Sequence, residues 1–143
     1  MVLNRKIIDK FFDKVEKKVV KAQTDIAKDA LSLLFRRSPH AGENQAQGEY
    51  DANHKIAINN GPSSSHHGPT NSSVASKAYV NREKAKLSRV KIGDVVTVLN
   101  DTEHAIDVEI GRNNPGNRWH RRGYYPYRTT KIDLMGKYKN VIR

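Results

Sequence analysis

The segment VVTVLNDTEHAIDVEIG, from Val95 to Gly111, carries the signals of a strand, a sharp turn and a short helix in succession. Its first half is a run of β-branched and aliphatic residues, which is typical of a buried strand. Gly111 stands where a C-cap glycine ends a helix. We therefore predict a buried strand that leads into a short helix, with Glu109 two residues before the terminal glycine. The turn between them contains three residues of the N-cap type, which are Asn100, Asp101 and Thr102.

Upstream of this segment, residues 4–36 predict one long amphipathic helix. Apolar residues recur at steps of three and four, and neither Gly nor Pro interrupts them. Such a helix would be roughly 50 Å long at about 1.5 Å per residue, which is longer than a core of this size covers. We expect either that one end projects onto a neighbouring subunit or that the helix breaks. The apolar positions are Ile8, Phe11, Phe12, Val15, Val19, Ala22, Ile26, Ala30, Leu33 and Leu34.

The middle of the chain predicts alternating loops and regular elements. Residues 39–48 follow a Ser-Pro stop and are rich in Gly, Asn and Gln, which indicates a loop. From Glu49 to Asn59 the pattern has period two and predicts a half-buried strand, with His54 on its apolar side as a core residue. Residues 59–73 contain two Gly-Pro pairs and a serine run, so we expect a mobile loop. A second helix is predicted over 74–87, with Val74, Ala75, Ala78, Ala85 and Leu87 on its apolar side.

The 143 residues carry a net charge of +11 that is unevenly distributed. Residues 1–37 hold ten Lys/Arg against five Asp/Glu, residues 38–111 hold seven against nine, and residues 112–143 hold nine against one. Such a basic C-terminal part predicts an anionic partner, either nucleic acid or an acidic protein surface. A solvated basic face is the alternative interpretation.

Composition also excludes several kinds of site. The chain has no cysteine, so neither a disulfide framework nor a thiolate metal site is possible. We find no apolar run near the roughly 20 residues of a membrane helix and no signal-peptide pattern, and so expect no membrane partner. The adjacent His66 and His67 do not face one site on a helix or strand, so we predict no metal and no cofactor.

An enzyme is the least favoured of the function classes. A nuclease would need side chains such as His104, Glu109 and His120 to converge. Five residues separate the first two, which places them about 140° apart around a helix. No paired carboxylates with metal-ligand spacing accompany them. We therefore predict no catalytic residues.

A basic loop is predicted over 112–123, and it leads into an aromatic segment. Arginines that alternate with aromatic residues suit a phosphate backbone or single-stranded bases. They equally suit a protein interface, where Arg, Trp and Tyr are enriched. Pro126 is expected to begin a last helix that reaches Leu134 and ends near Gly136, with Tyr127, Thr130 and Leu134 on one side. The candidates for an interface or a DNA-facing lumen are Arg112, Arg118, Trp119, Arg121, Arg122, Tyr124, Tyr125 and Arg128.

The order of these motifs resembles the tail-completion, or neck, proteins of long-tailed bacteriophages, within the broad minor-tail-protein family. The resemblance covers roughly residues 30–135. It rests on Ser38-Pro39, the Gly-x-Tyr-x-Ala-Asn run from Gly48, the Gly-Asp-Val-Val-Thr-Val-x-Asn strand, and a Gly-Tyr-Tyr segment before the last helix. The structural motif residues are Asn100, Ala105, Glu109 and Gly111. Asn100 and Glu109 are expected to cap a helix or to pair with an arginine of a neighbouring subunit. His104 stands where the family usually has tyrosine, and Arg121-Arg122-Gly123-Tyr124 stands in place of its Ala-Pro-x-Gly-Met element.

The resemblance implies a single α+β domain over 1–143, with a long N-terminal helix packed on a small antiparallel or mixed sheet and two or three shorter helices. It also implies a homo-oligomeric ring of six copies in the virion neck, assembled in the host cytoplasm. The ring would lie between connector or adaptor proteins and tail-tube or tail-terminator proteins, and genomic DNA would pass its lumen without sequence specificity. No enzymatic activity is implied. A free nucleic-acid-binding protein is the alternative, although no recognition motif supports it.

Overall fold

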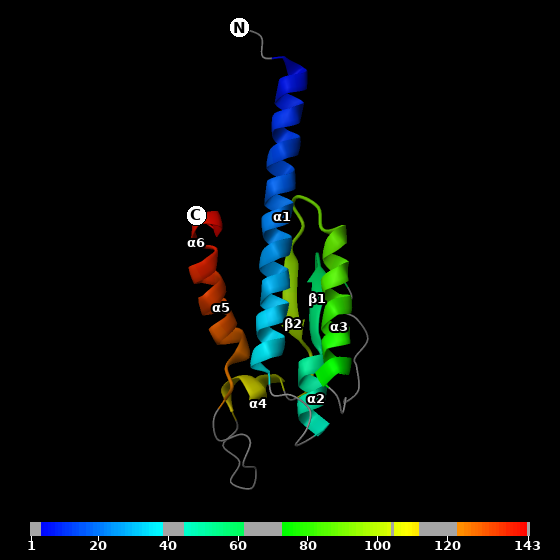
Figure 1. Cartoon of the computed structure of the whole chain (residues 1–143), viewed down its shortest axis with the longest axis vertical. Coiled ribbons are helices and arrows are strands. Elements are labelled where there is room, and N and C mark those ends of the chain that lie inside the picture. The colour runs from blue at the N-terminus through cyan, green and yellow to red at the C-terminus, as the bar shows by residue number, and fades with distance from the viewer. Residues whose placement is uncertain (1–3, 39–44, 62–72, 104, 112–122, 143) are drawn as a thin grey trace.

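The computed structural model describes residues 4–38, 45–61, 73–103, 105–111 and 123–142. The fold is α+β, as the sequence predicted, with one long helix, a small antiparallel sheet and several short helices (Figure 1). In chain order the elements are α1 (Arg5–Arg37), α2 (Gln45–Ala52), β1 (His54–Ile58), α3 (Ser73–Lys86), a 3₁₀ turn (Leu87–Arg89), β2 (Val96–Asn100), α4 (Ala105–Ile110), α5 (Pro126–Lys137) and α6 (Lys139–Ile142).

The long helix α1 is confirmed and it does not break. The Asn4 side chain caps its start by accepting a hydrogen bond from the backbone N–H of Lys6 at 3.0 Å. Ser38 leaves the helix in an extended conformation, as expected for the residue before Pro39. The C-terminal half packs into the domain, whereas the N-terminal half projects beyond every other element (Figure 1). The buried residues are Ala27, Ala30, Leu31 and Leu34.

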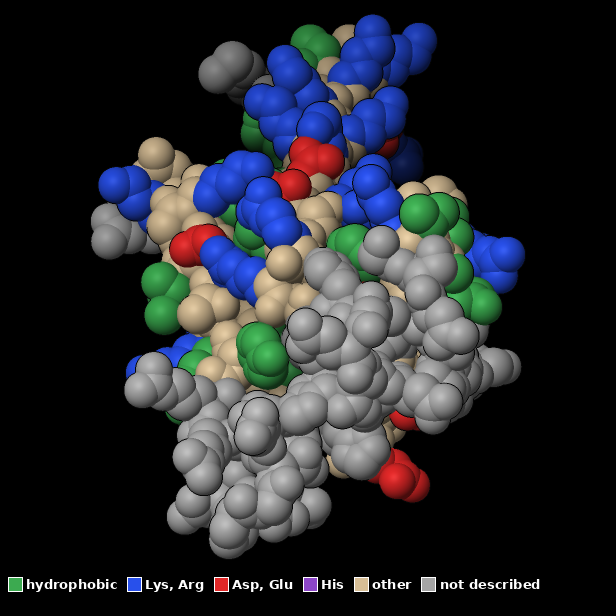
Figure 2. All heavy atoms as spheres, turned by 60° about the horizontal axis from the view of Figure 1, so that its bottom comes forward, with side chains coloured by type: hydrophobic (Ala, Val, Ile, Leu, Met, Phe, Trp, Pro, Cys, Tyr) green, Lys and Arg blue, Asp and Glu red, His purple; other side chains and the backbone are tan. Residues whose placement is uncertain are grey.

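Charge follows the same division of α1. Residues 5–21 of the projecting half contain seven Lys/Arg and three Asp/Glu. Figure 2 shows Lys and Arg side chains gathered over the upper part of the face in view, where this half lies. A basic surface therefore occurs at the N-terminal end of the structure as well as in the C-terminal sequence.

The sheet consists of β1 and β2, paired antiparallel from His54 opposite Asn100 to Ile58 opposite Val96. Helix α3 covers the other edge of β1. There the buried carboxylate of Glu83 accepts the backbone N–H of Ile56 at 2.8 Å and the ammonium of Lys86 at 2.7 Å. The Glu83 side chain thus accepts a hydrogen bond from a backbone N–H at the edge of the sheet that could otherwise pair with another strand.

The prediction for residues 39–59 was partly wrong. Residues 45–52 form α2 rather than loop and strand, and β1 begins only at His54. Alternation failed as a guide because both faces of this segment are buried: Asp51, Asn53 and Lys55 are as inaccessible as Tyr50. The strand over 95–99 was expected to be buried, but β2 is only half-buried along its whole length.

The helix predicted over 74–87 is present as α3 and the 3₁₀ turn, but of its predicted apolar side only Leu87 is buried in the core. Val74 is 76% exposed, whereas Ser76, Val80 and Glu83 are buried. Glu83 is buried because it binds the edge of β1, a role that no helical periodicity reveals. The core cluster comprises Ala27, Leu31, Ile56, Val80, Leu87 and Val90.

Helix α5 lies along the C-terminal half of α1, and polar contacts join their outer sides. Arg37 pairs with Asp133 and donates to Thr130 Oγ1 at 3.2 Å. Further along, the Asp29 carboxylate accepts from both Lys137 and Tyr138 at 2.5 Å. The helix begins at Pro126 as predicted but continues through Gly136 to Lys137, and α6 follows. Within the described ranges, no helix combines the length and apolar character needed to cross a membrane.

Candidate functional site

The glutamate of the strand-to-helix motif joins two helices. Glu109 lies near the end of α4, and its carboxylate reaches the first turn of α5. Oε2 accepts the backbone N–H of Tyr127 and Oε1 accepts that of Arg128, both at 2.9 Å. A carboxylate at this position also interacts favourably with the positive end of the helix dipole. Glu109 is therefore a capping residue supplied by a different helix.

This contact accounts for the free donors at the start of α5. Tyr125, at the N-cap, adopts a left-handed conformation with φ 50° and its side chain makes no capping bond. Its backbone N–H instead donates to the carbonyl of Glu109 at 3.0 Å. Pro126 has no N–H, and the carboxylate of Glu109 satisfies the next two donors. Glu109 of α4 thus accepts the backbone N–H groups of Tyr125, Tyr127 and Arg128 at the start of α5.

Two glycines make the junction between α4 and α5 possible. Gly111 has φ 79° and donates to the carbonyl of Asp107 at 2.8 Å, which ends α4 as the sequence predicted. Gly123 lies directly against the end of α4: a Cβ on it would be 2.3 Å from the Glu109 carbonyl oxygen and 2.5 Å from the Ile110 carbonyl carbon. Only glycine fits at 123 because the contacted atoms are backbone. We call Glu109, Gly111 and Gly123–Tyr125 the helix clasp.

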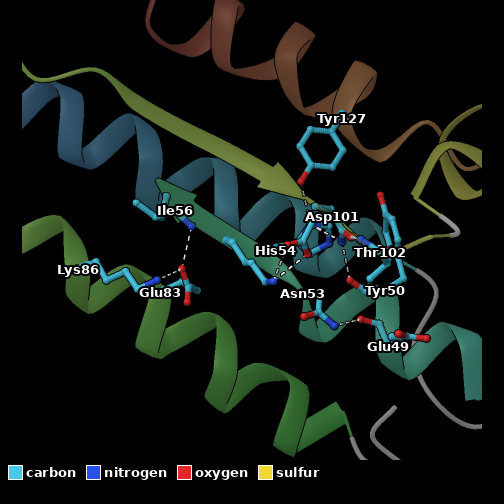
Figure 3. Close-up of polar contacts among 12 residues, drawn as sticks. Glu49, Tyr50, Asn53, His54, Ile56, Glu83, Lys86, Asp101, Thr102 and Tyr127 are labelled. Carbon is cyan, nitrogen blue, oxygen red and sulfur yellow. Dashed lines mark hydrogen bonds and ion pairs between the residues drawn. The ribbon is translucent and has the colours of Figure 1, made fainter. Parts of the chain in front are cut away.

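A buried histidine begins strand β1. His54 is fully inaccessible and lies opposite Asn100 in the sheet (Figure 3). Its Nε2 is 2.6 Å from Ser38 Oγ, and its Nδ1 is 3.2 Å from the hydroxyl of Tyr127. The imidazole therefore links the end of α1, strand β1 and helix α5. The ring of Tyr50, from α2, packs edge-on against it at 5.0 Å between centroids.

The partners of His54 define its tautomer. Ser38 donates its hydroxyl proton to the carbonyl of Leu34 at 2.7 Å, so its oxygen accepts from Nε2–H. Nδ1 then accepts from Tyr127 and from the Asn100 amide, 3.4 Å away. Burial lowers the pKa of His54 to about 3, so the ring is neutral. The sequence-based interpretation of His54 as a core residue with satisfied hydrogen bonds is confirmed.

The remaining motif residues serve the same junction. Asn100 donates to the carbonyl of Tyr50 at 2.8 Å, and its carbonyl oxygen accepts the hydroxyl of Thr102 at 2.8 Å. These bonds turn the chain sharply out of β2. Ala105 begins α4, and its N–H donates to the carbonyl of Thr102 at 3.0 Å. The motif is therefore structural, as predicted for Asn100 and Glu109.

An apolar and aromatic surface lies beside the helix clasp. Ile106 and Ile110 are 70% and 60% exposed and are one turn apart on α4. Tyr124 and Tyr125 are exposed and attached to the same helix, since Tyr124 N–H donates to the Val108 carbonyl at 2.8 Å. The guanidinium of Arg128 lies 5.9 Å from the centre of the Tyr125 ring. We call Ile106, Ile110, Tyr124, Tyr125 and Arg128 the α4 patch.

A second exposed apolar surface lies on the projecting half of α1. Phe11 is 62% exposed, Phe12 60% and Val19 47%. Ile7 and Val15 are also exposed on this half. The only ring contact of Phe11 in the described residues is with its neighbour Phe12. The α4 patch and this surface lie at opposite ends of the long axis of the molecule (Figure 1).

An open cavity of about 330 Å³ separates α5 from α1 and β2. Tyr127, Thr130 and Leu134 line it from α5, which confirms that these three share one side of the helix. Ile26 and Ala30 line it from α1 and Val98 from β2. The lining is almost wholly apolar and contains no paired acids, so it offers packing space rather than reactive groups.

Several predicted positions fall outside the described residues. These include the histidines of the hypothetical nuclease, His104 and His120, and the adjacent pair His66 and His67. The carboxylate of the third nuclease candidate, Glu109, is engaged in the helix clasp. Within the described part of the chain, no group of three His, Asp or Glu residues could hold a metal ion. The interface candidates outside the described residues are Arg112, Arg118, Trp119, Arg121 and Arg122.

Sequence reasoning missed two functional contacts of this junction. The sequence signal at Gly123 is a glycine directly before two tyrosines. The backbone of Ile110, which it contacts on α4, lies 13 residues earlier in the sequence. The partnership of Ser38, His54 and Tyr127 joins segments that no local pattern connects. Comparisons of the chain with family models, curated proteins and solved structures give no match.

Proposed function

We propose that the chain is a structural subunit of a bacteriophage neck, where it forms a ring that completes the tail or the head–tail junction and lets DNA pass. Six copies are proposed, between connector or adaptor proteins and tail-tube or tail-terminator proteins. The resemblance in motif order supplies this setting. The residues that carry it also belong to one structural unit, since Glu109, Gly111 and Gly123 together form the helix clasp.

One observation carries the proposal: the subunit has two exposed apolar surfaces, at opposite ends of its long axis. A ring requires two contact surfaces on each copy, because each copy has a neighbour on either side. The α4 patch and the projecting half of α1 meet that requirement. Both contain aromatic side chains, and aromatic residues are enriched among the few that contribute most of the binding energy of a protein interface.

The test begins with the solution mass of the purified full-length chain, measured by light scattering over a range of concentrations. We expect a discrete oligomer. A double variant, Ile106→Glu with Ile110→Glu, places two charges in the α4 patch and should reduce the mass to that of a smaller species. The matched control is Val74→Glu, which alters a 76% exposed apolar side chain on α3. Equal masses for the variant and the control would exclude the α4 patch as a contact surface.

The virion setting needs its own measurement. Mass spectrometry of purified phage particles should detect the chain at a few copies per particle. Particles that lack it would remove the neck proposal, even if the isolated chain oligomerises.

A free nucleic-acid-binding protein is the alternative, and one observation favours it. Five lysines of the projecting half of α1 border a shared surface hollow: Lys10, Lys14, Lys17, Lys18 and Lys21. Phosphate neutralisation by such residues would give affinity that falls steeply with salt. Filter binding of the isolated chain to duplex and single-stranded DNA over a salt range distinguishes the two functions. Tight, strongly salt-dependent binding by a monomer favours the alternative.

A further inference from the structure

The apolar residues of α1 follow a spacing that its length alone does not require. From Ile8 to Ile26 they are separated by steps of four, three, four, three and four residues. Alternating steps of three and four produce the apolar seam of a coiled coil, in which the a and d positions of a heptad face a partner helix. The seam consists of Ile8, Phe12, Val15, Val19, Ala22 and Ile26.

Among the described residues, contacts from α5 lie at the lower end of this seam. Ile26 borders the cavity against α5, and the contact of Asp29 with Lys137 and Tyr138 secures the end of α5 beside α1. Above this level, Phe12, Val15 and Val19 are 60%, 38% and 47% exposed, whereas Ile8 and Ala22 are half-buried. Exposed residues that share one seam and include an aromatic ring indicate an interface, unlike scattered single apolar residues.

The charges beside the seam differ in sign between its two flanks. At 100° per residue, Lys14 and Lys18 lie on one flank, whereas Asp9 and Glu16 lie on the other. Each flank has one exception, which is Arg5 on the acidic flank and Asp25 on the basic flank. A partner helix that lies on the seam would therefore find a basic border on one side and an acidic border on the other.

This asymmetry distinguishes the two ways of pairing identical helices. In a parallel pair, each helix turns one flank toward the opposite flank of its partner, so the lysines of one copy face the carboxylates of the other. In an antiparallel pair, like flanks meet, and Asp9 and Glu16 of both copies would come together. Like charges in such positions are destabilising. The charge pattern therefore fits a second copy of α1 in parallel orientation.

We infer that the projecting halves of α1 from two copies of this chain pack in parallel along the heptad seam. The contact deepens the proposed self-assembly and rests on it. A parallel pair places the two domains side by side at the same end of the helices. The α4 patch, at the far end of each domain, then remains available for a different contact.

Because the chain has no cysteine, disulfide formation can test this orientation directly. Two full-length variants, Ile8→Cys and Val19→Cys, are prepared separately and oxidised under mild conditions. In a parallel pair both positions meet their own copy, so both variants should form disulfide-linked dimers. The two positions are about 16 Å apart along the helix, so an antiparallel pair can bring only one of them onto its own copy.

The matched control is Lys17→Cys, which lies on the side of α1 opposite the seam and should remain unlinked. Linking at both seam positions but not at Lys17 supports the inference. Linking at one seam position only, or equally at all three, overturns it. If the chain forms a discrete oligomer but neither seam variant links, the parallel contact is wrong while the proposed self-assembly stands. A chain that stays monomeric at every concentration removes both proposals.

A charge variant provides a second measurement that does not depend on oxidation. Phe12→Glu should shift the dissociation of the oligomer to at least tenfold higher concentration in analytical ultracentrifugation. The domain should remain folded, because Phe12 lies outside the core. Unchanged association by this variant, with an unchanged circular dichroism spectrum, would contradict the inference.

Discussion

The carboxylate of Glu109 accepts the backbone N–H of Tyr127 at 2.9 Å, and so ties the last turn of α4 to the first turn of α5. The two residues are 18 positions apart, and the chain between them includes part of the basic stretch predicted as a contact surface. The helix clasp thus holds both ends of that stretch at one place. The strength of the contacts in the helix clasp therefore determines how firmly α5 is held beside α1.

Replacement of Glu109 by alanine is expected to destabilise the fold. The backbone donors of Tyr127 and Arg128 would lose their acceptor, and loss of a helix cap typically costs about 0.5–2 kcal/mol. The melting temperature should fall by roughly 2–8 °C. Thermal and urea unfolding measure the change, and Glu16→Ala, on the exposed projecting half of α1, is the control. Equal stability of the two variants would show that Glu109 contributes nothing through the clasp.

Two glycine substitutions should act in opposite directions. Gly123→Ala forces a Cβ to within 2.3 Å of the Glu109 carbonyl oxygen, so the clasp must open and stability should fall by at least about 1–3 kcal/mol. Gly136→Ala meets no atom within 4 Å and lies inside α5, where alanine is favoured over glycine by about 0.8–1 kcal/mol. Chemical denaturation of both variants checks the signs. A neutral Gly123→Ala would contradict the close approach of the two backbones.

His54 should make the fold acid-sensitive. Burial lowers its pKa to about 3 in the folded chain, whereas an unfolded histidine titrates near 6.5. As pH falls below 6.5, the unfolded state takes up a proton that the folded state does not, so stability decreases by about 1.4 kcal/mol per pH unit. Roughly 2 kcal/mol should be lost between pH 7 and pH 5.

The variant His54→Gln isolates this effect. It removes the titrating group and should be less stable at pH 7, yet its stability should depend less on pH between 7 and 5. Measurements stay above pH 5 because the lysine-bonded carboxyl of Asp29 and the asparagine-bonded carboxyl of Asp94 have lowered pKa values and lose their own contributions in stronger acid. Parallel pH profiles for the variant and the parent would exclude His54 as the source.

A pair of tyrosine variants tests the hydrogen bond between His54 and Tyr127. Tyr127→Phe removes a donor from the buried Nδ1 of His54 and should cost about 0.5–1.5 kcal/mol. Tyr50→Phe removes a buried hydroxyl that has no hydrogen-bond partner among the described residues, so it should be neutral or stabilising. Urea unfolding compares them. The reverse order of stabilities would refute the assigned network.

Local sequence signals were sufficient for the helices that have clear ends. Helix α1 ends before Ser38, the residue that precedes Pro39 in the sequence, and α5 begins at Pro126, because proline geometry acts within a few residues. Gly111 likewise ends α4. Each of these predictions depended on chemistry local to one helix end.

Periodicity failed where tertiary contacts cover both sides of a segment. Alternation over 49–59 predicted one wet face, but Asp51, Asn53 and Lys55 are buried, and Glu83 of α3 binds the outer edge of β1. Because of the same contact, Glu83 lies on the buried side of α3, where apolar residues were expected. Sequence pattern reports only exposed and buried sides, so it cannot identify a polar side chain that is buried to bind a backbone N–H.

The clasp shows a related limit. The sequence suggested that Glu109 caps a helix or pairs with a neighbouring subunit's arginine, and it does cap a helix, but the helix is α5. Which of several possible partners a carboxylate reaches depends on how the chain folds back. Gly123 supplies the geometry, and its requirement is visible only once the two backbones are placed together.

Helix α1 is continuous from its buried half to its uncovered tip, so its amide protons report two different events. Those near Leu31 and Leu34 should exchange with deuterium only when the domain opens. Those near Phe12 should exchange rapidly by fraying in a free subunit and slow down once a partner lies on that tip. Hydrogen exchange measured peptide by peptide along this helix would therefore distinguish unfolding of the domain from binding of a partner to the tip of α1.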